Sequence, residues 1–285
     1  MNSALADYLA TERLPADYAE VVERVLTPMA GRIAAAPRGA GPQVVGITGS
    51  QGSGKSAAAG ALAILLREAG LQAAVLSIDD LYLTRAERAA LAARVHPLFA
   101  TRGVPGTHDV GLGLAVLDSL GAPGETAVPR FDKGRDDRRP PEQWDWVAGP
   151  LDVILFEGWC VGARPQRPDA LARPVNDLER DEDPLGVWRR YANDQLAGPY
   201  RPLFARIGLQ VLLRDPGFET VLGWRRQQEA KLREREGGGQ SDAELARFVQ
   251  FYERLTRHID AEMPTRADVV VQLGPEREIR SIRGL

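Results

Sequence analysis

Residues 49–56 carry the most specific chemical signal in the chain. They read Gly-Ser-Gln-Gly-Ser-Gly-Lys-Ser and match the pattern G-x-x-x-x-G-K-[ST] in full. Glycines at these positions let the backbone turn tightly, so that its N–H groups point at phosphate oxygens. In this pattern Lys55 reaches the β- and γ-phosphates, and the Ser56 hydroxyl ligates Mg²⁺. The sequence therefore predicts a site for a nucleoside triphosphate and Mg²⁺, and we call residues 49–56 the phosphate loop.

Two expected elements flank the phosphate loop and position it. Residues 43–47 have the apolar character of a buried strand, and residues 57–69 are rich in Ala and Leu, which favours a helix. The positive end of this helix dipole adds to the field that attracts phosphate. The alternative, a Gly/Ser turn with a solvated lysine, leaves both flanks unexplained. The residues expected to contact the nucleotide are Gly49, Ser50, Gln51, Gly52, Ser53, Gly54, Lys55, Ser56 and Ala57.

Four further apolar runs, at 73–78, 151–156, 209–213 and 267–273, are separated by segments long enough for helical crossovers. This alternation predicts an α/β fold, a five-stranded parallel sheet flanked by helices, with ligands at the carboxyl ends of the strands. Residues 1–40 have apolar positions at helical spacing and end in a stretch rich in Pro and Gly. We expect them to form a helical N-terminal extension packed on the core, with residues 41–285 as the main domain.

Acidic residues stand directly after two of the predicted strands. Asp79 and Asp80 belong to the end of the run at 73–78, and Glu157 follows the run at 151–156. Phosphoryl transfer to a hydroxyl needs one carboxylate to accept the proton and another to hold Mg²⁺ or its waters. Alternatively, Asp79 or Asp80 caps a helix that begins near Thr84, and Glu157 is a surface acid. Their place at the carboxyl ends of strands in a nucleotide-binding fold favours catalysis.

Two long loops between the second and third predicted strands, residues 102–109 and 129–141, are rich in turn residues. Loops of this length in a compact domain are usually functional. The second holds many charges of both signs, so it either binds an anionic substrate or pairs its charges within itself. His108 in the first loop is a candidate base, although a single loop histidine is more often a structural hydrogen-bonding residue.

A strongly charged helix is expected over residues 219–236, ended by Gly237, Gly238 and Gly239. The sequence that follows, Ser241 to Glu244, is a capping box for the next helix. Charge pairs at i,i+4 account for most side chains of the first helix. A subset of its cations is expected to close over the nucleotide, because phosphoryl transfer gains from a cation near the migrating phosphate.

The composition of the 285 residues narrows the class of partner. A formal charge of −3 gives no basic footprint for nucleic acid, so none is expected as a partner. The longest apolar run, 57–66, is far shorter than a membrane span, and the N-terminus lacks the features of a signal peptide. The single cysteine, Cys160, permits no internal disulfide and is not expected to be catalytic. These features predict a soluble, cytoplasmic protein that binds small molecules.

The order of these motifs resembles the uridine kinase and phosphoribulokinase group of P-loop kinases. Several segments are still more similar to plant-type D-glycerate 3-kinases and their fungal and bacterial relatives. The segments that carry this resemblance are the phosphate loop, 102–109 (RGVPGTHD), 129–133 (PRFDK), 156–162 (FEGWCVG) and 224–229 (WRRQQE). The resemblance implies a P-loop kinase domain over residues 41–285 that transfers the ATP γ-phosphate to the 3-hydroxyl of D-glycerate, with Mg²⁺.

The resemblance also implies roles for individual residues. Asp79 matches the carboxylate that activates the acceptor hydroxyl, and Arg225 or Arg226 matches a lid arginine. Phe131 stands where the wider group commonly has tyrosine, which disfavours a nucleoside-style contact and suits a smaller acceptor. The catalytic residues expected are Asp79, Lys55, Glu157 and Arg225, and the metal ligands expected are Ser56 and Glu157. The expected substrate contacts are Asp80, Tyr82, His108, Asp109, Arg130, Asp132, Lys133 and Arg138.

The carboxylate of glycerate calls for a cation in the acceptor pocket. Arg130, Lys133 and Arg138 are candidates, and Arg138 is the first choice because the motif places it in the pocket. The same cations are also able to pair with acids of their own loop, so the sequence alone leaves the acceptor open. One alternative is a kinase for a nucleoside, pantothenate or a sugar phosphate. Another is a nucleotide-binding switch, although the chain has no N-K-x-D stretch of the GTPase type.

Overall fold

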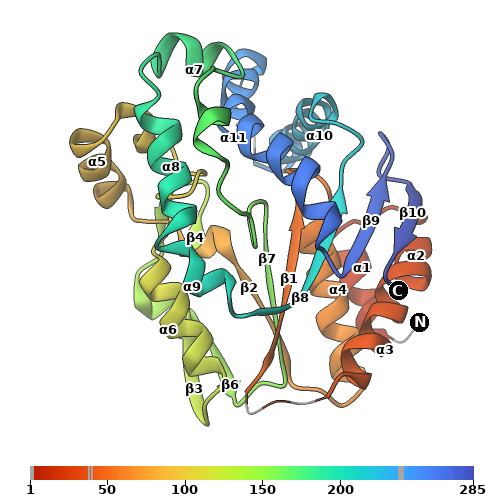
Figure 1. Ribbon diagram of the computed structural model, residues 1–285. Coiled ribbons are helices and arrows are strands. Elements are labelled where there is room, and N and C mark those ends of the chain that lie inside the picture. Colours follow the sequence, from red (N-terminus) through yellow and green to blue (C-terminus); the bar gives the residue numbers. More distant parts are fainter. Residues whose placement is uncertain (1–2, 38, 40, 237–240) are drawn as a thin grey trace.

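The computed structural model describes residues 3–37, 39, 41–236 and 241–285 of the chain. Its centre is a six-stranded sheet in the order β10-β9-β8-β1-β7-β2 (Figure 1). Five of these strands are parallel to one another, as predicted, and the sixth, β10, pairs antiparallel with β9 at the edge. The strands are β1 (Gln43–Gly49), β2 (Ala73–Ser77), β7 (Val153–Gly158), β8 (Ile207–Arg214), β9 (Val269–Leu273) and β10 (Ile279–Arg283).

Two small hairpins lie outside the main sheet. Strand β3 (Gly124–Val128) pairs with β6 (Asp145–Gly149), and β4 (Phe131–Asp132) pairs with β5 (Asp137–Arg138). The predicted loop at 129–141 is therefore partly ordered as the β4–β5 hairpin. None of these four strands was predicted from the sequence, and β4 and β5, with two residues each, are too short to show a readable alternation.

Helices cover both faces of the sheet, with α6, α8 and α9 on one side and α1, α3 and α4 on the other (Figure 1). The residues of β7 alternate between the two layers: Val153 and Leu155 pack with α4, whereas Ile154 and Phe156 face the other layer. The helices are α1 (Ser3–Thr11), α2 (Tyr18–Val21), α3 (Thr27–Ala35), α4 (Lys55–Glu68), α5 (Arg85–Arg94), α6 (Val110–Leu120), α7 (Asp177–Glu182), α8 (Val187–Ala197), α9 (Tyr200–Phe204), α10 (Glu219–Glu236) and α11 (Asp242–Glu262).

The N-terminal helices pack directly on the helix that follows the phosphate loop. A π-helical turn, Val22–Leu26, joins α2 to α3, and its buried Val25 and Leu26 share a core with α4. The Tyr8 hydroxyl donates a hydrogen bond to the Ala57 carbonyl at 3.3 Å. The described part of residues 1–40 is thus helical, while the division of the chain into two units at residue 41 stays a prediction.

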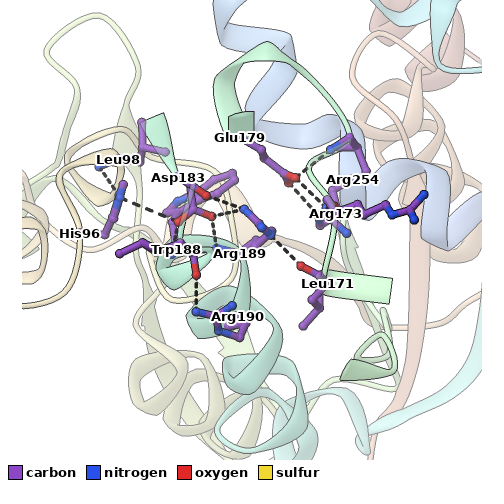
Figure 2. Close-up of polar contacts among 12 residues, drawn as sticks. His96, Leu98, Leu171, Arg173, Glu179, Asp183, Trp188, Arg189, Arg190 and Arg254 are labelled. Carbon is purple, nitrogen blue, oxygen red and sulfur yellow. Dashed lines mark hydrogen bonds and ion pairs between the residues drawn. The ribbon is translucent and has the colours of Figure 1, made fainter. Parts of the chain in front are cut away.

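Two buried ion pairs fasten α7 and α8 to the rest of the molecule (Figure 2). Arg254 of α11 contacts both oxygens of Glu179 at 2.6 Å. Arg189 pairs with Asp183 at 3.0 Å and donates to the Leu171 carbonyl. Loss of one partner from a buried pair costs about 3–5 kcal/mol, because the other charge is left without compensation. These pairs therefore fix the position of α8, whose Trp188 shares a buried core with Val104 of the 102–109 loop.

The start of α11 lies within the described residues, whereas the residues that follow α10 do not. Ser241 caps α11 in a reciprocal capping box with Glu244, as predicted. The three glycines expected to end α10 lie outside the described residues. Within the part of the chain that the structure describes, no helix has the length and apolar character needed to cross a membrane.

Candidate active site

The phosphate loop joins β1 to α4 in the predicted order. Gly52 and Gly54 have φ of +82° and +89°, in the left-handed region that glycine adopts without strain. Close approach also restricts Gly52, because a Cβ there would come within 2.6 Å of the Trp224 Cβ. The hydroxyls of Ser50 and Ser53 are buried without a hydrogen-bond partner among the described residues. A loop with free donors and a helix start at Lys55 is suited to binding phosphate.

Ser56 and Glu157 meet although 101 residues separate them: Ser56 Oγ donates to Glu157 Oε1 at 3.1 Å. Glu157 ends β7 and is only 4% exposed, and its Oε2 has no hydrogen-bond partner among the described residues. Burial raises the pKa of Glu157, and the charge of Lys55 opposes that rise. Two oxygen donors beside the phosphate loop fit Mg²⁺, which needs few protein ligands when phosphate oxygens and water supply the rest. The two predicted metal ligands are therefore neighbours in the structure, and their role in binding the ion stays a prediction.

Asp79 lies in a 3-10 turn, Ile78–Leu81, that directly follows β2. Lys133, from the turn between β4 and β5, donates from Nζ to Asp79 Oδ2 at 2.7 Å. Burial alone would raise the pKa of Asp79, but the charges of Lys133 and Lys55 outweigh it and hold that pKa below its ordinary value. Asp79 is consequently ionised at neutral pH and able to accept a hydrogen bond from an alcohol.

Asp80 uses both carboxylate oxygens to hold the β4 strand. Oδ1 accepts from the Phe131 N–H at 2.9 Å, and Oδ2 accepts from Arg130 Nη1 at 2.9 Å. Arg130 also pairs with Asp145 at 2.7 Å. The helix near Thr84 is capped by Thr84 itself, in a capping box with Glu87, so neither Asp79 nor Asp80 caps it. The contacts of Asp80 and Arg130 therefore position the β4–β5 hairpin over Asp79.

Arg138 and Asp109, two predicted substrate contacts, pair with each other. Arg138 Nη1 donates to Asp109 Oδ2 and its Nη2 donates to Glu87, both at 3.1 Å, and its side chain is only 10% exposed. The other oxygen of Asp109 caps α6 through the Leu112 N–H. Asp132, a further predicted contact, accepts two backbone N–H groups and shapes the β4–β5 turn.

Tyr82 and His108 form an aromatic wall beside Asp79. Their rings stack with centroids 4.5 Å apart, and Phe131 packs edge-on against Tyr82. His108 Nδ1 lies 2.6 Å from the Tyr200 hydroxyl, which also accepts the Gly106 N–H. Burial lowers the pKa of His108 to about 3, so the ring is neutral.

Comparisons with known proteins show which family the chain belongs to. The chain is 37% identical over 224 residues to the protein named uncharacterized kinase mug58 of Schizosaccharomyces pombe, an alignment that covers 74% of this chain and 78% of that one. It is 32% identical over 225 residues to the chloroplastic D-glycerate 3-kinase of Arabidopsis thaliana, covering 74% of this chain but only 46% of the plant enzyme. The chain belongs to the plant-type D-glycerate 3-kinase family of P-loop kinases.

A solved structure supports the same family. The D-glycerate 3-kinase from Cryptococcus neoformans var. grubii superposes on this P-loop kinase with a TM-score of 0.73, at 26% identity, covering 90% of this chain and 98% of that one. The profile of the family described as methylmalonyl Co-A mutase-associated GTPase MeaB matches residues 21–83. That match spans the phosphate loop with the strand and helix beside it, a motif that P-loop proteins of different functions share.

A cation that was not among the expected site residues, Arg102, lies against Phe131 of β4. Arg102 pairs with Asp136, and its guanidinium lies 5.4 Å from the centroid of Phe131. The charge of Arg102 also acts on Lys133 and on the Tyr82 hydroxyl. In the sequence, Arg102 begins the segment 102–109, which carries part of the family resemblance. In the structure it stands beside Gly103, whose φ is +142°.

Helix α10 of the kinase contacts the phosphate loop through Trp224. This side chain is 2% exposed and donates from Nε1 to the Pro275 carbonyl at 2.6 Å. Arg225 lies with its guanidinium 5.6 Å from the Phe248 ring of α11, and its charge acts on Tyr252. Arg226 instead pairs with Asp242 at 3.5 Å on an exposed surface. Of the two predicted lid arginines, Arg225 is thus the one directed toward the interior.

Proposed function

We propose that the protein transfers the γ-phosphate of ATP to the 3-hydroxyl of D-glycerate, which gives 3-phospho-D-glycerate and ADP. The contact between Lys133 and Asp79 carries this proposal, because it places a cation for an acidic acceptor beside the carboxylate that accepts its proton. The names of two family members, the plant and the Cryptococcus D-glycerate 3-kinases, support the same acceptor.

In the proposed reaction, the acceptor oxygen attacks the γ-phosphorus, and the bond from that phosphorus to the β–γ bridging oxygen breaks. The hydroxyl proton passes to the oxygen of Asp79 that Lys133 does not hold. Lys55 and the backbone N–H groups of the phosphate loop stabilise charge on the phosphate oxygens. Mg²⁺, held by Ser56 and by Glu157 directly or through water, neutralises phosphate charge when bound. We propose Arg225 as the lid cation, since it faces the interior.

The acceptor carboxylate, in this proposal, is held by Lys133 together with Arg102. Arg102 lies against the ring of Phe131 and Lys133 contacts Asp79, and the two cations are near enough for the charge of Arg102 to act on the pKa of Lys133. Arg138, the first choice from the sequence, already pairs with two carboxylates and is only 10% exposed. We therefore propose that Arg138 acts indirectly, by holding the start of α6 and the adjacent loop.

A coupled assay of ADP release across possible acceptors tests this function. D-Glycerate, L-glycerate, glycerol, nucleosides, pantothenate and sugar phosphates are each supplied with ATP and Mg²⁺. Turnover with D-glycerate at a kcat/KM at least a hundredfold above glycerol supports the proposal, because glycerol lacks the carboxylate. Preferred use of a nucleoside, pantothenate or a sugar phosphate contradicts it.

A further inference from the structure

A cavity of about 380 Å³ lies against the phosphate loop. One wall is the loop and the first turn of α4, from Gly52 to Ala58, and another is the turn between β9 and β10. The remaining wall comes from the N-terminal segment, through residues that include Leu14, Tyr18 and Val21. The cavity is thus shared between the phosphate loop and a segment that the sequence analysis placed outside the main domain.

The order of the strands decides which half of a nucleotide faces this cavity. Asp79 comes just after β2 and Glu157 is near the end of β7, and both strands lie on one side of β1. Leu213 of β8 and Leu273 of β9, on the other side of β1, line the cavity. The γ-phosphate must point toward Asp79, because phosphoryl transfer requires it to lie beside the acceptor. The α-phosphate and its nucleoside therefore leave the loop toward the cavity.

The walls of the cavity suit a flat heteroaromatic ring with polar edges. Val21, Leu213 and Leu273 supply apolar surface, as binding pockets for bases and similar ligands commonly do. The Tyr18 hydroxyl is buried and has no hydrogen-bond partner among the described residues. A ligand edge that pairs with this hydroxyl would remove an unsatisfied polar group.

The β9–β10 turn is hydrogen-bonded to the phosphate loop, so one wall of the cavity is held directly against the phosphate site. Arg277, which has a φ of +66°, donates from Nε to the Gly52 carbonyl at 2.5 Å. Its Nη1 donates to Gln227 of α10 at 2.7 Å, and its guanidinium lies 5.0 Å from the centroid of the Trp224 ring.

We propose that this cavity holds the nucleoside half of the nucleotide, with the N-terminal segment at residues 14–25 as its outer wall. The inference rests on the proposed function only in taking a nucleoside triphosphate as the donor; it does not depend on the acceptor. It assigns the N-terminal segment a part in nucleotide binding, in addition to its packing on α4.

Isothermal titration calorimetry with two ligands tests this assignment. Val21→Trp fills the cavity, and Ala19→Trp puts the same side chain on an exposed position of the same helix as a matched control. ADP reports the phosphate loop and the cavity together, whereas inorganic tripolyphosphate reports the loop alone. We expect Val21→Trp to weaken ADP binding at least tenfold and to leave tripolyphosphate binding unchanged, with neither changed in the control. Unchanged ADP binding, or an equal loss of both ligands in the folded variant, overturns the assignment.

Photolabelling of the unmodified protein covers the case in which Val21→Trp fails to fold. With 8-azido-ATP, label on peptides from residues 14–25 or from the β9–β10 turn supports the assignment, and label confined to other peptides overturns it. Neither experiment includes an acceptor. A failure of the glycerate assay and a failure of this inference are therefore seen separately.

Discussion

The ammonium of Lys133 lies 2.7 Å from Asp79 Oδ2, although 54 residues separate the two in the chain. The contact exists because Asp80, the neighbour of Asp79, anchors the β4 strand through Arg130 and the Phe131 N–H. It keeps Asp79 ionised and leaves a cation beside it. A phosphoryl acceptor with its own carboxylate would thus find a proton acceptor and a counter-charge in one place.

Asp79→Asn is expected to lower kcat by about two to four powers of ten, since the substitution keeps the size of the side chain but removes the proton acceptor. The affinity for ATP should change little, because Asp79 does not belong to the phosphate loop. Steady-state kinetics and ATP titration of the variant check both parts. Normal turnover by the folded variant would show that Asp79 has only a structural role.

Lys133→Ala should raise the KM for D-glycerate by tens to a hundredfold, since a hydrogen bond to a charged group contributes roughly 1.5–3 kcal/mol. The same change removes the main charge that lowers the Asp79 pKa, so the acid limb of the kcat/KM profile should move to higher pH. Arg138→Ala is the comparison. It should reduce stability through Asp109 and Glu87 while raising the glycerate KM less than Lys133→Ala does. If Arg138→Ala raised the glycerate KM more than Lys133→Ala did, Arg138 rather than Lys133 would bind the carboxylate of glycerate.

His108 should make the wild type sensitive to acid. Burial lowers its pKa to about 3 in the folded protein from an ordinary 6.5, so between these values the unfolded chain binds a proton that the folded one does not. Stability is therefore lost as the pH falls, by about 1.4 kcal/mol per pH unit from this residue. Urea unfolding of wild type and His108→Gln at several values between pH 6 and pH 4 measures the difference. Parallel pH dependences would mean that His108 is protonated in the fold.

Lys55→Ala should abolish turnover, because it removes the charge that stabilises the transferring phosphoryl group, an effect worth several powers of ten in rate. The circular dichroism spectrum and melting temperature should stay close to those of the wild type, since Lys55 lies at the helix start and outside the buried core. If this variant kept activity near that of the wild type, the phosphate loop would have no part in the reaction.

The five parallel strands and the phosphate loop were predicted correctly, because each is specified by local sequence. A buried strand such as β7 reads as an unbroken apolar run, and Gly52 and Gly54 are required by local backbone conformation. Strand β10 was missed. Its Ile279 and Ile282 are separated by exposed polar residues, and it is an edge strand whose pairing with β9 is decided by the turn between them.

The partners of the charged loop were not predictable from the sequence. Arg130 pairs with Asp80 and Asp145 rather than with an acid of its own loop, since β2 and the β4–β5 hairpin meet only in the folded chain. Asp136 likewise pairs with Arg88 and Arg102, which lie far from it in sequence. Residue types at strand ends singled out Asp79 and Glu157 as candidates, but no local pattern indicates that Arg102 lies against Phe131.

The position of the phosphate on the product tests the central claim most directly. The protein is incubated with D-glycerate, ATP and Mg²⁺, and the product is examined by ¹H–³¹P correlation NMR, with the Asp79→Asn protein as the matched control. We expect a phosphorus coupled to the two protons on C3, as in 3-phospho-D-glycerate, and almost no product from the variant. Coupling to the single proton on C2, or no phosphorylated glycerate from the active wild-type protein, would contradict it.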